Sequence, residues 1–154
     1  MTLEEEIENE LKKKNIWYFK PRTKSDFPLN FPEGTGLKFK KYYPNTGKFP
    51  DFLVFDNKYI YIEVFGMGIS SYINGKNEKI EILNDNNIQY FFIDEKAKKL
   101  YIKSDKKGES IRLPKSSQKI IEILKKEFPS LSKPKFINLN SFYSRNLTFF
   151  FEFF

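Results

Sequence analysis

The chain has 154 residues, which suits one domain with a buried core. It has no cysteine and no histidine, which excludes disulfides, thiol nucleophiles, zinc–thiolate sites and every catalytic triad that uses histidine. Lysine and arginine exceed aspartate and glutamate by 27 to 20, which favours polyanionic partners, nucleic acid first, although an AT-rich genome also yields chains rich in Lys, Asn, Ile and Phe.

A helix is predicted over residues 2–14. Thr2 is a suitable N-cap and Glu5, three residues later, completes a capping box. Glu4 lies beside the apolar stripe of this helix, which consists of Leu3, Ile7 and Leu11.

The next elements are a strand at 16–19, a loop at 21–36 and a basic, aromatic segment at 37–43. Two short apolar runs follow at 49–56 and 59–66, and the turn between them predicts an antiparallel hairpin. The remaining predicted elements are a helix at 73–86, a buried strand at 88–94, a hairpin around Lys106–Gly108 and an amphipathic helix at 115–127.

This order of elements predicts an α/β fold, a mixed sheet with helices on its faces. Residues 1–128 are expected to form the domain, and residues 129–154 a C-terminal, aromatic-rich extension. The phenylalanines of that extension predict packing on the core or on a partner subunit, because a free apolar tail would aggregate.

Asp51 and Glu63 each lie in one of the two apolar runs of the first hairpin. Two carboxylates that point into one cleft repel each other, and a divalent cation such as Mg²⁺ or Mn²⁺ would relieve the repulsion. The alternative for Asp51 is a hydrogen bond to local backbone after Pro50. The alternative for Glu63 is a solvent-facing side chain or one paired with a lysine.

Lys76 and Lys79 are three residues apart and share one face of the predicted helix 73–86, the face that continues to Leu83. Two lysines at the start of a core-facing stripe predict either a role near Glu63 or snorkelling, in which the stems cover apolar surface.

This ordered pattern resembles the PD-(D/E)XK nuclease superfamily, which has the restriction-endonuclease-like fold. The segment FPDFLVFDNKYIYIEVFG is similar to its central signature, with Pro50-Asp51 followed by Glu63 on the next strand. The spacing of Tyr72 and Lys79 resembles a branch of the superfamily in which the lysine has moved to the following helix. Glu4, seven residues before Leu11, resembles the acid of the opening helix in that branch. The resemblance covers residues 2–94 and implies an αβββαβ core.

The resemblance implies a metal-dependent endonuclease with Mg²⁺ or Mn²⁺ as cofactor. Asp51, Glu63 and Glu4 would bind the metal, the Val64 carbonyl would add an oxygen ligand, and Lys79 would be the catalytic lysine with Lys76 in reserve. The chain departs from the pattern at Phe65, because the usual motif has lysine two residues after the acid. That departure leaves open a catalytically inactive, nucleic-acid-binding or interaction module on the same fold.

Nucleic acid, DNA before RNA, is the expected partner. Basic and aromatic residues alternate in the segment 37–48, which favours phosphate and base contacts, although an edge strand blunted by lysines has the same pattern. The nucleic-acid-binding residues predicted are Lys38, Lys40, Lys41, Lys48 and Lys76. The basic hairpin near residues 94–109 is more typical of a solvated surface.

A homodimer would suit an enzyme that cuts both strands of a duplex. The N-terminus is acidic and no run reaches membrane-spanning length, so the expectation is a cytoplasmic, soluble protein without a membrane partner. A third interpretation, unrelated to the resemblance, is a small basic structural protein of mobile-element origin whose acids form surface pairs.

Overall fold

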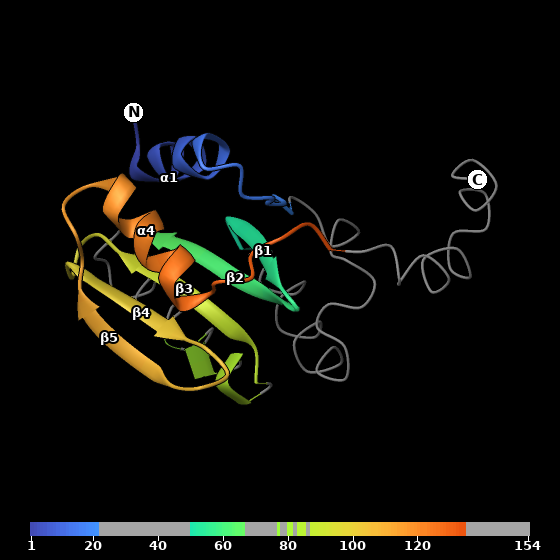
Figure 1. The fold of residues 1–154 in the computed structure, drawn as a ribbon. Helices are drawn as coiled ribbons and strands as arrows, with labels where there is room; N and C mark the ends of the chain where they lie inside the picture. The colour runs from blue at the N-terminus through green and yellow to red at the C-terminus, as the bar shows by residue number, and fades with distance from the viewer. Residues whose placement is uncertain (22–49, 67–76, 78–79, 82, 86, 135–154) are drawn as a thin grey trace, which may run out of the picture.

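A computed structural model of the chain describes residues 1–21, 50–66, 77, 80–81, 83–85 and 87–134 (Figure 1). Its elements in chain order are α1 (Leu3–Lys13), β1 (Phe52–Asp56), β2 (Lys58–Phe65), β3 (Gln89–Asp94), β4 (Lys99–Lys103), β5 (Gly108–Arg112) and α4 (Ser117–Glu127). The described residues between 77 and 85 are helical, as the sequence predicts.

The described strands form one open sheet in the order β1-β2-β3-β4-β5. β2 and β3 run parallel, and every other neighbouring pair is antiparallel. Parallel neighbours need a crossover connection, and the helical residues before β3 belong to that connection. The prediction of a mixed α/β sheet is therefore confirmed.

Helix α1 begins where the sequence predicts, because its cap is built into the first residues. The hydroxyl of Thr2 accepts a hydrogen bond from the Glu5 backbone N–H at 3.2 Å. Acidic side chains occupy the first turn and lysines the last, which complements the helix dipole. α4 has the same kind of cap, with the Ser116 hydroxyl accepting from the Lys119 N–H at 3.2 Å.

Helices cover both faces of the sheet. α1 and α4 pack against one face, here called the α1/α4 face, and Leu83 and Ile80 of the crossover pack against the other, here called the Leu83 face. Alternate residues along each strand serve the two faces. On β2, for example, Ile60 and Ile62 belong to the α1/α4 core, whereas Tyr61 and Phe65 belong to the Leu83 core.

Tight turns join the antiparallel strands. Asp56 pairs with Lys58 across the first hairpin, and Asn57 between them adopts a φ of 60°. Positive φ is costly for most residues, and asparagine is among those that tolerate it best. The other described non-glycine residues with positive φ are Asn15, Asn87 and Lys98.

The predicted strand at 16–19 is wrong. Only Phe19 pairs with the sheet, through an isolated antiparallel bridge to Leu53. Asn15 has a φ of 56°, and the Ile16 N–H donates back to the Leu11 carbonyl at 2.9 Å. The first residues of this segment therefore form the C-terminal end of α1 and do not pair with the sheet. Too few residues then remain for an extended ladder.

Residues after α4 return to the outer edge of β1. The Ser132 N–H donates to the Phe55 carbonyl at 2.9 Å, and the Ser130 N–H donates to Asp56 Oδ2 at 3.1 Å. The predicted boundary after residue 128 therefore falls inside a segment that is hydrogen-bonded to the sheet as far as Ser132. Residues 135–154 of the predicted C-terminal extension lie outside the described residues.

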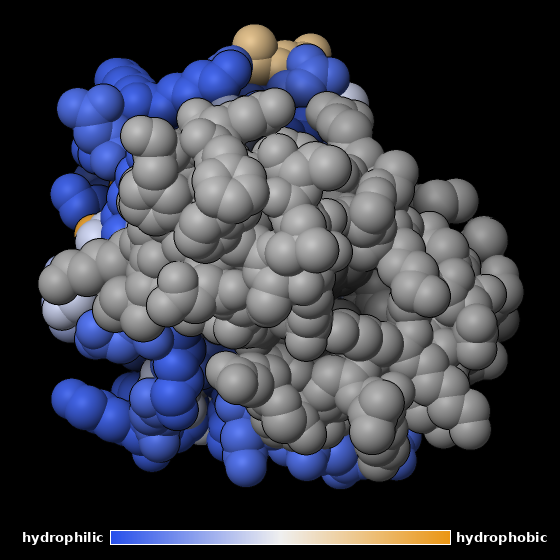
Figure 2. Space-filling model, turned by 90° about the vertical axis from the view of Figure 1, so that its right-hand side faces the viewer, coloured by the Kyte–Doolittle hydropathy of each residue, from blue (hydrophilic) through white to orange (hydrophobic). Residues whose placement is uncertain are grey.

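Apolar side chains are well covered. Among the described residues Met1 is the one large apolar side chain that is strongly exposed. The described surface visible in Figure 2 is otherwise mainly hydrophilic.

Candidate active site

Asp51 and Glu63 meet across the β1–β2 pair. Phe52 is in register with Ile62, so Asp51, the residue just before β1, lies opposite Glu63. The antiparallel hairpin therefore brings together two carboxylates that are separated in sequence by a complete turn and most of two strands.

Asp51 is hydrogen-bonded to a backbone N–H and has two carboxylates, Glu63 and Glu4, as neighbours. Its Oδ2 accepts a hydrogen bond from the Val64 N–H at 2.7 Å. Burial, repulsion from Glu63 and a hydrogen bond with Glu4 raise the pKa of Asp51 to about 9, although the Val64 N–H acts in the opposite direction. The bond that Asp51 makes is therefore to the backbone of the neighbouring strand and not to local backbone after Pro50, and Asp51 shares its surroundings with two other carboxylates.

Glu63 is buried, with 6% of its surface exposed. Along β2 it lies two residues after Tyr61 and two before Phe65, so the three side chains share the Leu83 face. The alternative in which Glu63 faces solvent is therefore wrong. A carboxylate at this depth is costly unless hydrogen bonds or a cation compensate it.

Glu4 reaches this place from α1. It is half-buried in the first turn, and its side chain is near enough to Asp51 to contribute to the raised pKa of that carboxyl. The Thr2 cap fixes where this turn begins, and the buried Ile7 and Leu11 hold the helix on the sheet. The predicted acids therefore come to the same neighbourhood from α1, from the residue just before β1 and from β2.

The donor chemistry of this neighbourhood suits a hard divalent cation, because it consists of carboxylate oxygens in a buried setting. Among the described residues, however, no group of three or more acidic side chains already has the geometry to hold a metal ion. Glu4 instead adds to burial and to Glu63 in raising the pKa of Asp51 to about 9, so Asp51 holds a proton at neutral pH. Binding of a metal would have to displace that proton and bring the three carboxylates closer together.

Val64 contributes to the site through its N–H. The predicted role of its carbonyl as a metal ligand stays a prediction. Phe65 is 3% exposed and packs edge-on against Phe92, with ring centroids 5.3 Å apart. The position that carries lysine in the usual motif is therefore part of the Leu83 core and supplies no cation.

A second polar cluster on α1 is not predicted by the sequence. Glu8, one helical turn after Glu4, accepts hydrogen bonds from the Tyr18 hydroxyl at 2.6 Å and from Lys20 Nζ at 3.0 Å. Lys20 Nζ lies 5.3 Å from the centroid of the Phe52 ring, next to Asp51 in the chain. The sequence did carry a signal for this cluster, because Tyr18 and Lys20 are two residues apart and would lie on one face of an extended segment.

Several predicted residues lie outside the described part of the chain. These are the two helix lysines, Lys76 and Lys79, and the basic residues of the segment before β1, Lys38, Lys40, Lys41 and Lys48. Their roles stay predictions.

Comparisons with protein families, with curated proteins and with solved structures found no match to this chain. None of the helices in the described part of the chain is long and apolar enough to cross a membrane.

Proposed function

We propose that the protein is a metal-dependent nuclease of the PD-(D/E)XK type that hydrolyses phosphodiester bonds in DNA. The observation that carries the proposal is the meeting of Glu4, Asp51 and Glu63 from three separate elements. Burial and the two neighbouring acids together raise the pKa of Asp51, as expected for a buried carboxylate that shares its surroundings with other acids.

The fold supports the same proposal. A helix is followed by an antiparallel hairpin, a helical crossover and a parallel strand, which agrees with the order of the αβββαβ core apart from the strand before the hairpin. In this proposal Phe19, which bridges to Leu53, would belong to that first strand.

In this proposal Asp51 and Glu63 would hold the cation, and Glu4 would complete its carboxylate shell. A bound Mg²⁺ or Mn²⁺ activates water as a nucleophile and offsets charge on the scissile phosphate. The Val64 N–H holds the Asp51 carboxylate in one orientation. Lys79 is the proposed cation that would orient the attacking water or offset the developing negative charge.

A cleavage assay tests the proposal. Single-stranded, duplex and branched DNA and RNA are incubated with the protein in Mg²⁺, Mn²⁺ or EDTA. Cleavage is expected with either metal and not with EDTA, and Asp51→Asn and Glu63→Gln should each lower the rate at least about 100-fold. Asp56→Asn, at the far end of β1, is the matched control. Wild-type rates in either site variant would refute the assignment of the acids.

An inactive nucleic-acid-binding module is the second candidate, and Phe65 is the observation that favours it. Its ring is fixed in the Leu83 core in place of the usual lysine. Salt-sensitive DNA binding without cleavage in any metal would select this candidate over the nuclease.

A further inference from the structure

One end of each of the five strands lies at the same end of the sheet as the proposed active site. β2 and β3 are parallel, so their C-terminal ends share an edge. β1 and β4 run the other way and begin at this edge, and β5 ends there. Asp51 and Glu63 therefore share one end of the sheet with the β3–β4 turn and with the last residue of β5.

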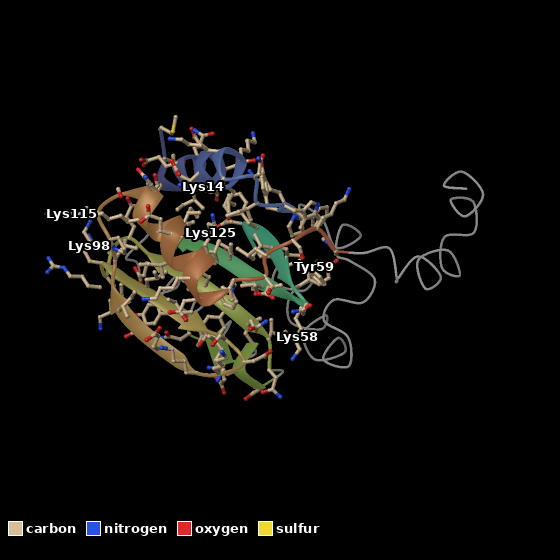
Figure 3. All side chains as sticks on the ribbon, in the orientation of Figure 1. Lys14, Lys58, Tyr59, Lys98, Lys115 and Lys125 are labelled. Carbon is tan, nitrogen blue, oxygen red and sulfur yellow. The ribbon has the colours of Figure 1, made fainter. Side chains whose placement is uncertain are left out.

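Exposed cations gather at that end, and four of them are here called the basic rim: Lys98, Lys99, Arg112 and Lys115. Lys96 is a further exposed lysine in the same β3–β4 turn. Lys99 is directly paired with Arg112 across β4 and β5. The Lys98 carbonyl accepts a hydrogen bond from the Leu113 N–H at 2.9 Å, which holds the turn beside the chain that leads to α4. Figure 3 shows Lys98 and Lys115 extending outward at the same edge of the molecule.

Two of these cations also share a face with the acids. Leu100 and Ile111, the chain neighbours of Lys99 and Arg112, pack on the α1/α4 side. By alternation Lys99 and Arg112 project to the Leu83 face, the face to which Glu63 belongs. Neighbouring strands lie about 4.8 Å apart, so β4 and β5 are roughly 10–15 Å from β2. A few nucleotides of one nucleic-acid strand span this distance.

The charges of the basic rim are not compensated by the described carboxylates. No ion pair to a described acid involves these four residues. The two acids of the β3–β4 turn are directed elsewhere. Asp94 is buried and accepts from the Ala97 N–H at 2.9 Å, and Glu95 Oε1 lies beside Gly66, 3.4 Å from the position of an added Cβ.

The opposite end of the same strands provides the contrast. There Lys58 pairs with Asp105 at 3.3 Å and Lys107 pairs with Glu109 at 3.5 Å. At this opposite end two of the exposed lysines, Lys58 and Lys107, have described ion-pair partners and Lys106 has none, whereas none of the four rim cations has one.

We propose that the basic rim binds the phosphodiester backbone of a nucleic-acid duplex and extends the substrate path from the carboxylates across β3, β4 and β5. The inference rests on the proposed function for the position of the cut, but the binding itself requires no cleavage. Phosphate contacts of this kind set affinity and orientation without reading sequence.

Binding is measured by fluorescence anisotropy with a labelled 20-base-pair DNA duplex, and with an RNA duplex of the same sequence, in EDTA over a series of salt concentrations. The test variant combines Lys98→Gln, Lys99→Gln and Arg112→Gln. The control combines Lys58→Gln, Lys106→Gln and Lys107→Gln, which removes the same charge from exposed positions at the opposite end. Circular dichroism and thermal melting verify that both variants fold.

The rim variant should bind at least one of the duplexes about 10- to 100-fold more weakly than wild type, and its slope of log K against log salt should be shallower by about 2–3. The control should stay within about threefold of wild type, because its three lysines lie at the end of the sheet away from the proposed active site and two of them are already paired on the surface. Equal losses in the two variants, no loss in the rim variant, or no salt-dependent binding by wild type would overturn the proposal.

The two proposals fail separately. Rim-dependent binding without cleavage in any metal would leave the basic rim standing and refute the nuclease. Cleavage by the rim variant with wild-type kcat/KM would leave the nuclease standing and refute the basic rim.

Discussion

Asp51 carries the clearest electrostatic signature at the residue scale. Its pKa is raised by burial, by Glu63 and by Glu4, so the folded protein binds a proton here that the unfolded chain releases near pH 4. Between pH 4 and about 9 the native state holds more protons than the unfolded state, and its stability falls as the pH rises.

For the metal-free protein we therefore predict that Asp51→Asn flattens this decline. The amide carries no charge at any pH, so the variant should gain about 1–2 kcal/mol relative to wild type at pH 8 and little at pH 5. Glu8, whose pKa is lowered, acts only below its ordinary pKa of 4.5 and leaves this window unaffected. Urea unfolding at both pH values in EDTA checks the result, and parallel curves for the two proteins would contradict it.

Glu4 should matter less than Asp51. It reaches the site from a helix, whereas Asp51 is fixed at its strand by the Val64 N–H. Glu4→Gln is expected to lower the cleavage rate about 10-fold, against at least about 100-fold for Asp51→Asn. Glu5→Gln, an exposed neighbour in the same first turn, is the control. Equal loss in Glu5→Gln would show that only general negative charge on the helix counts.

Lys79 is the residue on which catalytic competence depends in the proposed mechanism. Because Phe65 supplies no cation, Lys79→Ala should lower kcat about 100-fold with little change in DNA affinity. Lys76→Ala should instead weaken binding, in a way that fades with salt. Full activity in Lys79→Ala, measured in single-turnover cleavage, would remove the lysine from the mechanism.

At the scale of elements, the Glu8 cluster fastens α1 to the chain that leads into the sheet. Tyr18 also packs edge-on against Phe52, with ring centroids 5.7 Å apart. Burial and the bond to Glu8 raise the pKa of Tyr18 to about 12, so its hydroxyl keeps its proton and remains a donor at neutral pH. The cluster thus ties α1 to the residues that lead into the sheet.

Tyr18→Phe should lower the free energy of unfolding by about 1–2 kcal/mol, because it leaves the half-buried Glu8 carboxylate without its shortest hydrogen bond. In a double-mutant cycle with Glu8→Gln, the two changes should be coupled by at least about 0.5 kcal/mol. Strictly additive changes in urea unfolding would mean that the hydroxyl and the carboxylate do not stabilise α1 together.

Elements with a strong local signal were predictable from the sequence. The caps at Thr2 and Ser116 and the apolar stripes of α1 and α4 are local, and so is the turn at Asn57 that makes the first hairpin. The strand at 16–19 was not predictable, because pairing there depends on how α1 ends and on the distant Leu53. Apolar alternation alone does not reveal that only one residue bridges.

The site was predictable to the extent that register follows from a tight hairpin. Asp51 and Glu63 are opposite because the turn between β1 and β2 is short. The basic rim was not predictable, because it depends on strand order and direction across β2, β3, β4 and β5. Its lysines look in sequence like any solvated hairpin, and only the sheet shows which end of that hairpin is next to the acids.

At the scale of the whole molecule, the mutual repulsion of the acids predicts stabilisation by metal. A cation that binds only the folded state raises the melting temperature with its concentration. Addition of Mn²⁺ at about 10 times its Kd should stabilise wild type by about 1.4 kcal/mol. Asp51→Asn should lose most of this response and Asp56→Asn should keep it. The melting temperatures are measured by thermal unfolding, and equal Mn²⁺-induced shifts in both variants would indicate non-specific binding.

The left-handed backbone at Lys98 puts stability and binding in competition at a single residue. The other described non-glycine residues with positive φ are asparagines, which accept this geometry more readily than lysine does. Glycine would adopt it without strain, so Lys98→Gly should leave the fold as stable or more stable while weakening the hold on a nucleic-acid backbone. A directed-evolution experiment selecting for heat resistance alone would then be expected to lose this lysine, and one selecting for DNA retention would keep it.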